Sequence, residues 1–262
     1  MADKNVLEIK TVQASTFKQV IDALKEILMD VNLEFDETGM KIVAMDSTQV
    51  VLVHLKLNAD RFETYACEKK LYVGINMLKL HMLIKTIGNN DVLTLYVSED
   101  DPNNLGIRIE NPDKNSRTTF KLAMLDVDPL TLPPIAMDFE TIITMPSVDF
   151  QKVIRDMHNL AEYIEISNIE NQLMFKCKGD FCSQQTIIGT DGNQAIQVTK
   201  NVARTHEIIQ GIFSLKYLSM FTKCTNLSST VELYIKNNYP LVLCYSVASL
   251  GSIRLCLAGQ DA

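Results

Sequence analysis

The sequence repeats itself about halfway along, and no other feature restricts its fold as much. Similar segments recur in the same order, 133 to 138 positions apart: 17–21 with 150–154, 80–85 with 218–223, 93–97 with 231–235, and 121–123 with 256–258. One such match could arise by chance, because apolar alternation is common, but several in the same order are hard to explain that way. The 262 residues therefore predict two similar domains of roughly 125 residues each.

Most of the sequence alternates between apolar and polar residues with a period of two, which is typical of strands with one buried face. Good examples are segments 41–45, 50–57, 93–97, 106–109 and 231–235. Four segments show helical spacing instead: 14–28, 75–87, 147–161 and 214–224. In the first of these, Phe17 and Leu24 lie on one apolar stripe, and Ser15 is the expected N-cap. Many short strands with four helices predict an α+β protein dominated by antiparallel sheet.

A proline-rich segment separates the two halves. Its three prolines, at positions 129, 133 and 134, cannot donate to a strand ladder, and each restricts the preceding residue to extended conformations. We therefore predict an N-terminal domain over residues 1–124, a connecting linker over 125–138 and a C-terminal domain over 139–262. Leu130 and Leu132 are apolar residues in a linker that we expect to be exposed.

The charge of the chain is distributed unevenly. Its net charge of −7 would by itself argue against a nucleic-acid partner. The four helical segments, however, carry a net charge of +4, and the rest of the chain carries −11. An ordinary solvated face would explain any one of these helices. The segregation across all four favours a basic surface that faces a polyanion and binds phosphates without reading their sequence.

The sequence carries no signature of catalysis or of metal binding. It has no glycine-rich phosphate loop, and its four histidines lack ligand-like spacing to cysteines or carboxylates. Cys177 and Cys182 have no second pair, so no zinc site is expected. A metal-dependent nuclease is disfavoured, because no carboxylate cluster falls at strand ends in both repeats. We expect a binding protein that is not an enzyme and needs no cofactor.

The cellular setting is suggested by three further features. The six scattered cysteines predict buried thiols rather than disulfides. The N-terminus is charged and lacks the apolar stretch of a signal peptide, and no apolar run approaches the roughly 18 residues that span a bilayer. These features predict an intracellular protein with no membrane partner.

Several segments resemble the eukaryotic-type sliding clamp family, proliferating cell nuclear antigen. The similar segments are 39–53, 62–69, 126–127, 216–223, 227–231 and 239–242. The most specific are the Met45-Asp46-Ser47 run and the LSSTV run at 227–231. The similarity extends from residue 5 to residue 259, which is nearly the whole chain.

This resemblance implies a homotrimeric ring around duplex DNA, with antiparallel sheets outside and the four helices lining the hole. The chain would be a polymerase processivity factor that tethers DNA polymerases and repair enzymes and is loaded by a clamp loader ATPase. Segments 117–122 and 184–188 match the family's two subunit edges. The implied DNA-binding stretch runs from Ala66 to Lys85. The implied DNA-facing residues are Lys18, Lys25, Lys79, Lys85, Lys152, Arg155, Lys216 and Lys223.

Partners of this family dock through short peptides of the pattern Gln-x-x-apolar-x-x-aromatic-aromatic. The matching pocket positions in this sequence are Met45, Val50, Leu52, Leu130, Leu132, Pro240, Leu257 and Ala258. For the three strand residues Met45, Val50 and Leu52, plain strand core is the alternative interpretation.

Departures from the family pattern indicate a divergent member, from a protist or a large DNA virus. Gln49 stands where the family commonly has His, Ala66 replaces an Arg, and Gly259 replaces a Pro. Glu170 occupies the position of the lysine used for ubiquitin attachment. The expected location is the nucleus or a viral replication compartment. The alternative is a related processivity factor that acts as a monomer or dimer, or as one subunit of a heteromeric checkpoint-type ring.

Overall fold

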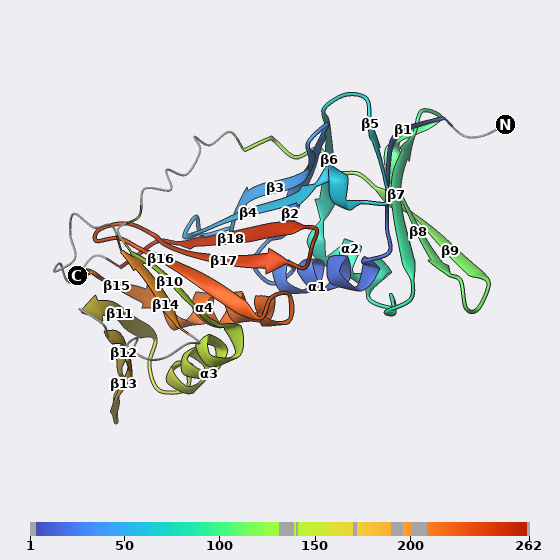
Figure 1. The fold of residues 1–262 in the computed structure, drawn as a ribbon. Coiled ribbons are helices and arrows are strands. Elements are labelled where there is room, and N and C mark those ends of the chain that lie inside the picture. Colours follow the sequence, from blue (N-terminus) through green and yellow to red (C-terminus); the bar gives the residue numbers. More distant parts are fainter. Residues whose placement is uncertain are drawn as a thin grey trace. The chain divides into compact units, whose positions relative to one another are not determined.

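The computed structural model describes residues 4–130, 139, 141–169, 172–189, 196–200 and 209–260. These residues form two compact units (Figure 1). The first unit comprises residues 4–47, 53–130 and 247–253. The second comprises residues 48–52, the described residues from 139 to 246, and residues 254–260. Most of the predicted linker, from 131 to 138, lies outside the described residues.

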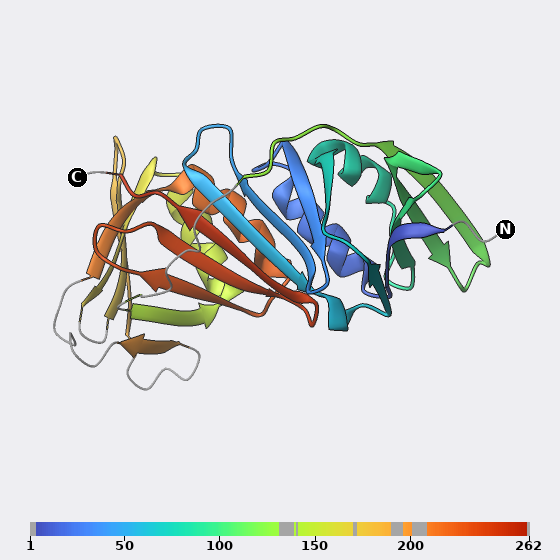
Figure 2. The same ribbon diagram turned by 90° about the horizontal axis from the view of Figure 1, so that it is seen from above.

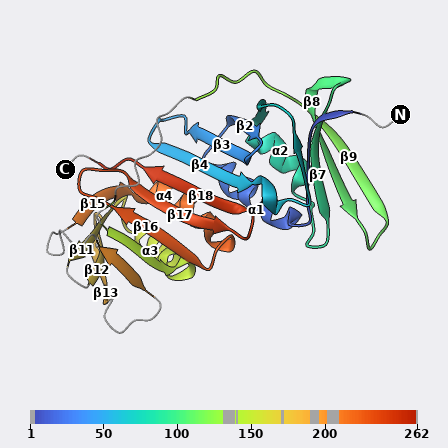
Figure 3. The same ribbon diagram turned by 45° about the horizontal axis from the view of Figure 1, so that its top comes forward.

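The first unit contains two groups of antiparallel strands. Its strands are β1 (Asn5–Thr11), β2 (Asp30–Asp36), β3 (Gly39–Met45), β4 (Val51–Asn58), β5 (Thr64–Cys67), β6 (Leu71–Asn76), β7 (Val92–Ser98), β8 (Asp101–Asn111) and β9 (Ser116–Ala123). A five-stranded sheet has the order β5-β1-β7-β8-β9, and a second group has the order β4-β3-β2-β6. In the five-stranded sheet, β9 is an end strand (Figure 3).

The second unit repeats this plan. Its strands are β10 (Thr141–Pro146), β11 (Tyr163–Ile169), β12 (Gln172–Lys178), β13 (Ser183–Gly189), β14 (Gln197–Lys200), β15 (Ile209–Ser214), β16 (Thr230–Ile235), β17 (Leu241–Val247) and β18 (Gly251–Leu257). One group has the order β14-β10-β16-β17-β18, and a four-stranded sheet has the order β13-β12-β11-β15. In the four-stranded sheet, β13 is an end strand (Figure 3).

Three strands contribute residues to both units, because the divisions between the units fall within β4, at the last residue of β17, and within β18. In the second unit, the backbone N–H of Ala258 donates to the oxygen of Val50 at 3.0 Å. In the first unit, the N–H of Asn58 donates to the oxygen of Leu250 at 2.9 Å. The neighbours β4 and β18 therefore run antiparallel.

The helices number four in the described part of the chain: α1 (Ala14–Leu24), α2 (Met77–Ile84), α3 (Ser147–His158) and α4 (Leu215–Phe221). Short 3₁₀ segments follow β4 and α4, at Ala59–Arg61 and Thr222–Asn226. All four α-helices were predicted, but each is shorter than its pattern suggested. In the pattern of 14–28, the apolar residues Ile27 and Leu28 are buried, yet they lie in the turn after α1.

The prediction that Ser15 caps the first helix is wrong. The N-cap of α1 is Gln13, and Ser15 lies inside the first turn. The backbone N–H of Gln13 donates to Oγ1 of Thr11 at 3.0 Å, which fixes the chain as it leaves β1. The helix begins earlier because Ala14 is fully buried and belongs to the core-facing stripe.

The order of elements is the same in both units, which confirms the internal repeat. Each unit consists of a strand, a helix, five strands, a second helix and three strands. The first unit has this order from β1 to β9 with α1 and α2, and the second has it from β10 to β18 with α3 and α4. By this order β4 corresponds to β13, and β18 corresponds to β9. The predicted α+β class with antiparallel sheets and four helices is confirmed as well.

Each unit packs its helix pair against its own strands. In the first unit α1 lies beside α2 (Figure 2). Phe17, Val20 and Leu24 of α1 are fully buried. In the second unit α3 contacts α4, and the ring of Phe150 lies 6.4 Å from the ring of Phe175. The alternation read from the sequence buries one face of strands such as β4 and β10, whereas β5, β9 and β13 contain no buried residue.

Candidate nucleic-acid and partner-binding surfaces

The four predicted DNA-facing lysines of the first unit divide into two kinds. Lys18 is half-buried, and its Nζ donates to the backbone oxygen of Ile87 at 2.5 Å. Lys25 is also half-buried, and its Nζ donates to Oδ1 of Asp22 at 2.5 Å. Lys79 and Lys85, in contrast, are exposed on α2 and just after it. Only these last two present their ammonium groups openly to a ligand.

Asp22, Lys25 and His81 form a small polar cluster that joins α1 to α2. Nε2 of His81 lies 2.9 Å from Asp22 Oδ1 and 3.3 Å from Lys25 Nζ. The cluster ties the two helices together over a separation of 56 residues between Lys25 and His81. Lys25 therefore contributes to the packing of the helices as well as to their charge.

The four predicted residues of the second unit, Lys152, Arg155, Lys216 and Lys223, are all exposed. Nε of Arg155 lies 3.6 Å from Asp156 Oδ1, a pair that is open to solvent. Nζ of Lys216 lies 5.5 Å from the ring centre of Tyr217. Two of these residues are on α3, and two are on α4 or directly after it, so both helices of this unit carry accessible positive charge.

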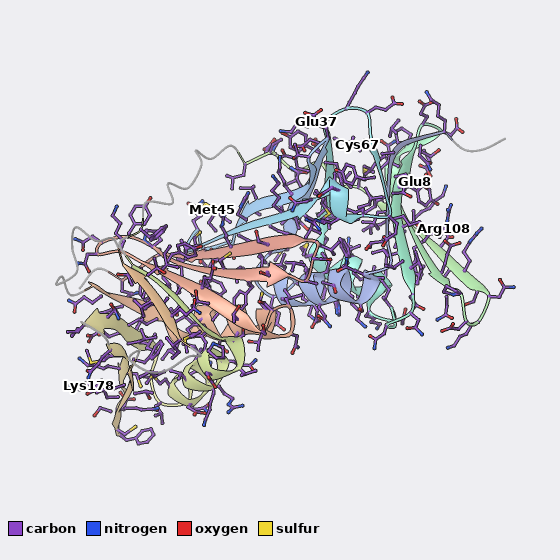
Figure 4. All side chains as sticks on the ribbon, in the orientation of Figure 1. Glu8, Glu37, Met45, Cys67, Arg108 and Lys178 are labelled. Atoms are coloured by element: carbon purple, nitrogen blue, oxygen red, sulfur yellow. The ribbon has the colours of Figure 1, made fainter. Side chains whose placement is uncertain are left out.

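The stretch from Ala66 to Lys85 runs from the end of β5 through β6 into α2. Figure 4 labels Cys67 at the end of β5 in the first unit. Cys67 Sγ donates to the oxygen of Lys69 at 3.0 Å, while Nζ of Lys70 pairs with Glu34 at 2.8 Å. Lys69 is exposed. Lys69 is therefore more available to a phosphate than Lys70, whose charge is paired with Glu34.

The predicted partner-binding residues of the second unit fall near one another. Leu52 packs against a buried cluster of Phe139, Val242 and Cys256. Pro240 and Ala258 line a pocket of about 810 Å³, and Val50 accepts the backbone hydrogen bond of Ala258. Leu257 differs from these residues because its side chain is completely buried, so it can only support the surface from beneath.

The remaining partner-binding candidates belong to the first unit or lie outside the description. Met45 is half-buried at the end of β3, and Figure 4 labels it there. Leu130 is 41% exposed, as expected for a linker residue. Leu132 and Glu170 lie outside the described residues.

Most of the wall of the pocket beside Pro240 comes from residues that the sequence patterns did not indicate. Its lining includes Gly211, Ile212 and Phe213 of β15, together with Tyr239 and Gln260. Gln260 is held by two hydrogen bonds, from its N–H to the oxygen of Ile212 at 2.9 Å and from its amide to the Tyr163 hydroxyl at 3.2 Å. The residues of β15 show no clean alternation, so no sequence signal singled them out.

The described cysteines are not arranged for catalysis. All six are free, and burial raises the pKa of Cys224 to about 12 and that of Cys256 to about 11. Such thiols stay protonated and unreactive at neutral pH. Among the described residues, no group of three or more His, Cys, Asp or Glu side chains is placed to hold a metal ion. No helix in this part of the chain is long and apolar enough to cross a membrane.

Comparison with known proteins covers both units. The family description "Proliferating cell nuclear antigen, N-terminal domain" matches residues 6–130, and "Proliferating cell nuclear antigen, C-terminal domain" matches residues 135–260. The chain is also similar to the "Probable DNA polymerase sliding clamp 1" of Paramecium bursaria Chlorella virus 1. The two are 39% identical over 263 residues, which cover 98% of each chain.

Proposed function

Because the chain belongs to the proliferating cell nuclear antigen family, we propose that it is a DNA sliding clamp that encircles duplex DNA and tethers DNA polymerase. The observation that carries this function is the repeated unit with exposed basic helices in a chain that is acidic overall. Exposed lysines and an arginine on helices bind phosphates without reading bases, as a sliding protein requires. The clamp itself catalyses no reaction and acts where DNA is replicated, in the nucleus or a viral compartment.

The proposed assembly is a head-to-tail homotrimer, and the internal repeat supports it. Within the chain, β18 neighbours β4. The equivalent strands in the other unit, β9 and β13, are both end strands of their sheets in the described residues. A second copy can therefore pair its β13 with β9 in the way that β4 pairs with β18. Repeated around a closed ring, this pairing removes every such edge.

The proposed partner site is the pocket beside Pro240 and Ala258. Its lining includes the exposed ring of Tyr239 together with the buried ring of Phe213, which suits an apolar and aromatic peptide anchor. Leu52 adds a half-buried apolar side chain to the second unit, and Leu130 is an exposed apolar side chain of the first unit. A Gln-x-x-apolar-x-x-aromatic-aromatic peptide is the proposed ligand, and polymerases and repair enzymes that carry it are the proposed partners. A clamp loader ATPase is the proposed partner that opens and closes the ring.

The function is tested by changing three exposed basic residues of the second unit, Lys152, Arg155 and Lys216, to Ala. We expect loading on primed circular DNA and processive extension to fall at least tenfold at moderate salt, because phosphate contacts are lost. The mass of the assembly by light scattering should stay near three chains of 29.5 kDa.

The matched control changes Lys4, Lys114 and Lys178 to Ala, three exposed lysines away from the helices. This variant should load and extend like the unaltered protein. Equal activity of both variants would remove the DNA role from the helices. A monomeric or dimeric mass for the unaltered protein would instead favour the related processivity factor, and a ring that needs a second kind of subunit would favour the heteromeric alternative.

A further inference from the structure

One carboxylate oxygen serves two basic side chains where α1 meets α2. Oδ1 of Asp22 accepts a hydrogen bond from Nζ of Lys25 at 2.5 Å, and Nε2 of His81 lies 2.9 Å from the same oxygen. The two basic nitrogens are 3.3 Å apart. Asp22 lies in α1 and Lys25 follows its last residue, whereas His81 lies in α2. The two basic groups therefore share one acceptor, and a positive charge on both sets them against each other.

The three side chains differ in how far solvent reaches them. The side chain of Asp22 is 53% exposed, while those of Lys25 and His81 are 22% and 17% exposed. At this point the helix pair presents a carboxylate to its surroundings, and the ammonium group of Lys25 is largely covered. An exposed carboxylate repels phosphates, so this arrangement weakens the attraction of the first unit for DNA.

The charges around this cluster are mostly positive. The other charged residues of the two helices and of the residues that directly follow them are Lys18, Glu26, Lys79 and Lys85. The strand β6 also packs against α2 and carries no charged residue. Lys79 and Lys85 are exposed, and Lys85 follows His81 by one helical turn. Three lysines against one glutamate oppose a second positive charge beside Lys25, unless a polyanion such as DNA offsets them.

We propose that Asp22 and His81 are positioning residues that decide whether Lys25 contacts DNA, an inference that rests on the proposed function because the ligand is duplex DNA. While His81 is neutral, Asp22 keeps Lys25 at the contact between the helices. A proton taken up from solvent makes His81 a cation that replaces Lys25 at Asp22 Oδ1, and the flexible stem of Lys25 then reaches a phosphate. Histidine ordinarily changes charge between about pH 5 and 8, so the first unit holds DNA more tightly as the pH falls through that range.

The pH profile of the DNA affinity tests this exchange. Binding of the whole chain to a short duplex is measured by fluorescence anisotropy at low salt. All variants carry His158→Gln, because His158 is an exposed histidine at the end of α3. We expect the affinity to rise about threefold from pH 8 to pH 6, the effect of one added phosphate contact. His81→Gln should lose this rise, although its amide can still donate to Asp22, and Lys25→Gln should lose it too.

A second measurement, at pH 8, does not depend on the proton. Asp22→Asn removes the charge that holds Lys25, so the DNA affinity should rise about threefold. The slope of log affinity against log salt should become steeper by about one for each Lys25 that gains a phosphate. Adding Lys25→Gln should abolish both gains. The matched control is Asp100→Asn, an exposed change of the same net charge away from the helices, which should leave the slope unchanged.

Two results would overturn the exchange. One is a rise in affinity toward pH 6 that survives His81→Gln. The other is an Asp22→Asn variant that melts at a different temperature but binds DNA with unchanged affinity and slope, since the cluster then only joins the helices. A failure of the proposed function looks different: changing Lys152, Arg155 and Lys216 to Ala would then also leave the DNA affinity unaltered.

Discussion

At the scale of the residue, Asp36 is a carboxylate whose charge stabilises the first unit. Burial alone would raise its pKa, but hydrogen bonds from Lys41 and Thr38 lower it from 3.8 to about 2. Because the folded-state pKa lies below the unfolded one, this contribution is complete above pH 4 and is lost as the pH falls toward 2. Asp36→Asn should cost roughly 1 to 2 kcal/mol of unfolding free energy at pH 7. The difference should vanish near pH 2, whereas Asp100→Asn, at an exposed position, should show little effect at either pH.

A second residue-scale prediction concerns Ala258 at the pocket beside Pro240. Ala258 is exposed on the pocket wall, so Ala258→Arg fills the space that a peptide anchor would need. Loss of an anchor contact typically costs about 2 kcal/mol, or about thirtyfold in affinity. Calorimetric titration of the Gln-x-x-apolar-x-x-aromatic-aromatic peptide measures this loss. The control is Asn103→Arg, at an exposed position of the first unit. If the two variants bind the peptide with equal affinity, the peptide does not bind in this pocket.

At the scale of the element, the end strands β9 and β13 determine whether copies can join. Successive N–H groups of an end strand point alternately into the sheet and outward. Of the neighbours Thr118 and Thr119, one has an N–H group that points away from the sheet. Changing that residue to Pro removes an outward donor, so it should abolish the trimer and keep the melting temperature. Ile187→Pro or its neighbour on β13 should do the same. Ala66→Pro on β5, the opposite end of the same sheet, should leave sedimentation unchanged, and trimers in every β9 and β13 variant would exclude these strands.

The helices and strands show which features of the fold the sequence patterns could predict. Alternation and helical spacing located the strands and the helices, because both patterns reflect burial of one face. The patterns predicted helices that are too long. For α1 the reason is that Ile27 and Leu28 are buried like helix residues although the helix ends at Leu24. The surroundings of the site residues depended on distant parts of the chain. Lys18 bonds to Ile87, and the pocket joins β15 to Tyr239 and Gln260, contacts that no local pattern encodes.

At the scale of the whole molecule, the proposed ring should hold DNA by enclosure rather than by affinity. Three chains of net charge −7 attract DNA only weakly from outside. A loaded clamp should therefore stay on circular DNA through gel filtration at 200 mM salt, although salt weakens phosphate contacts. Cutting the circle once should release it within the same experiment. Equal retention on cut and uncut DNA would indicate ordinary binding.

The sharing of β4 and β18 has a consequence for how the chain acquires its structure during synthesis. The first unit includes residues 247–253, which the ribosome adds long after residue 130. Until then, Asn58 lacks Leu250 as its acceptor, and one side of β4 has no neighbour. The N-terminal half therefore cannot complete its fold while it leaves the ribosome. The free edge of β4 stays unpaired until residues 247–253 have been synthesised.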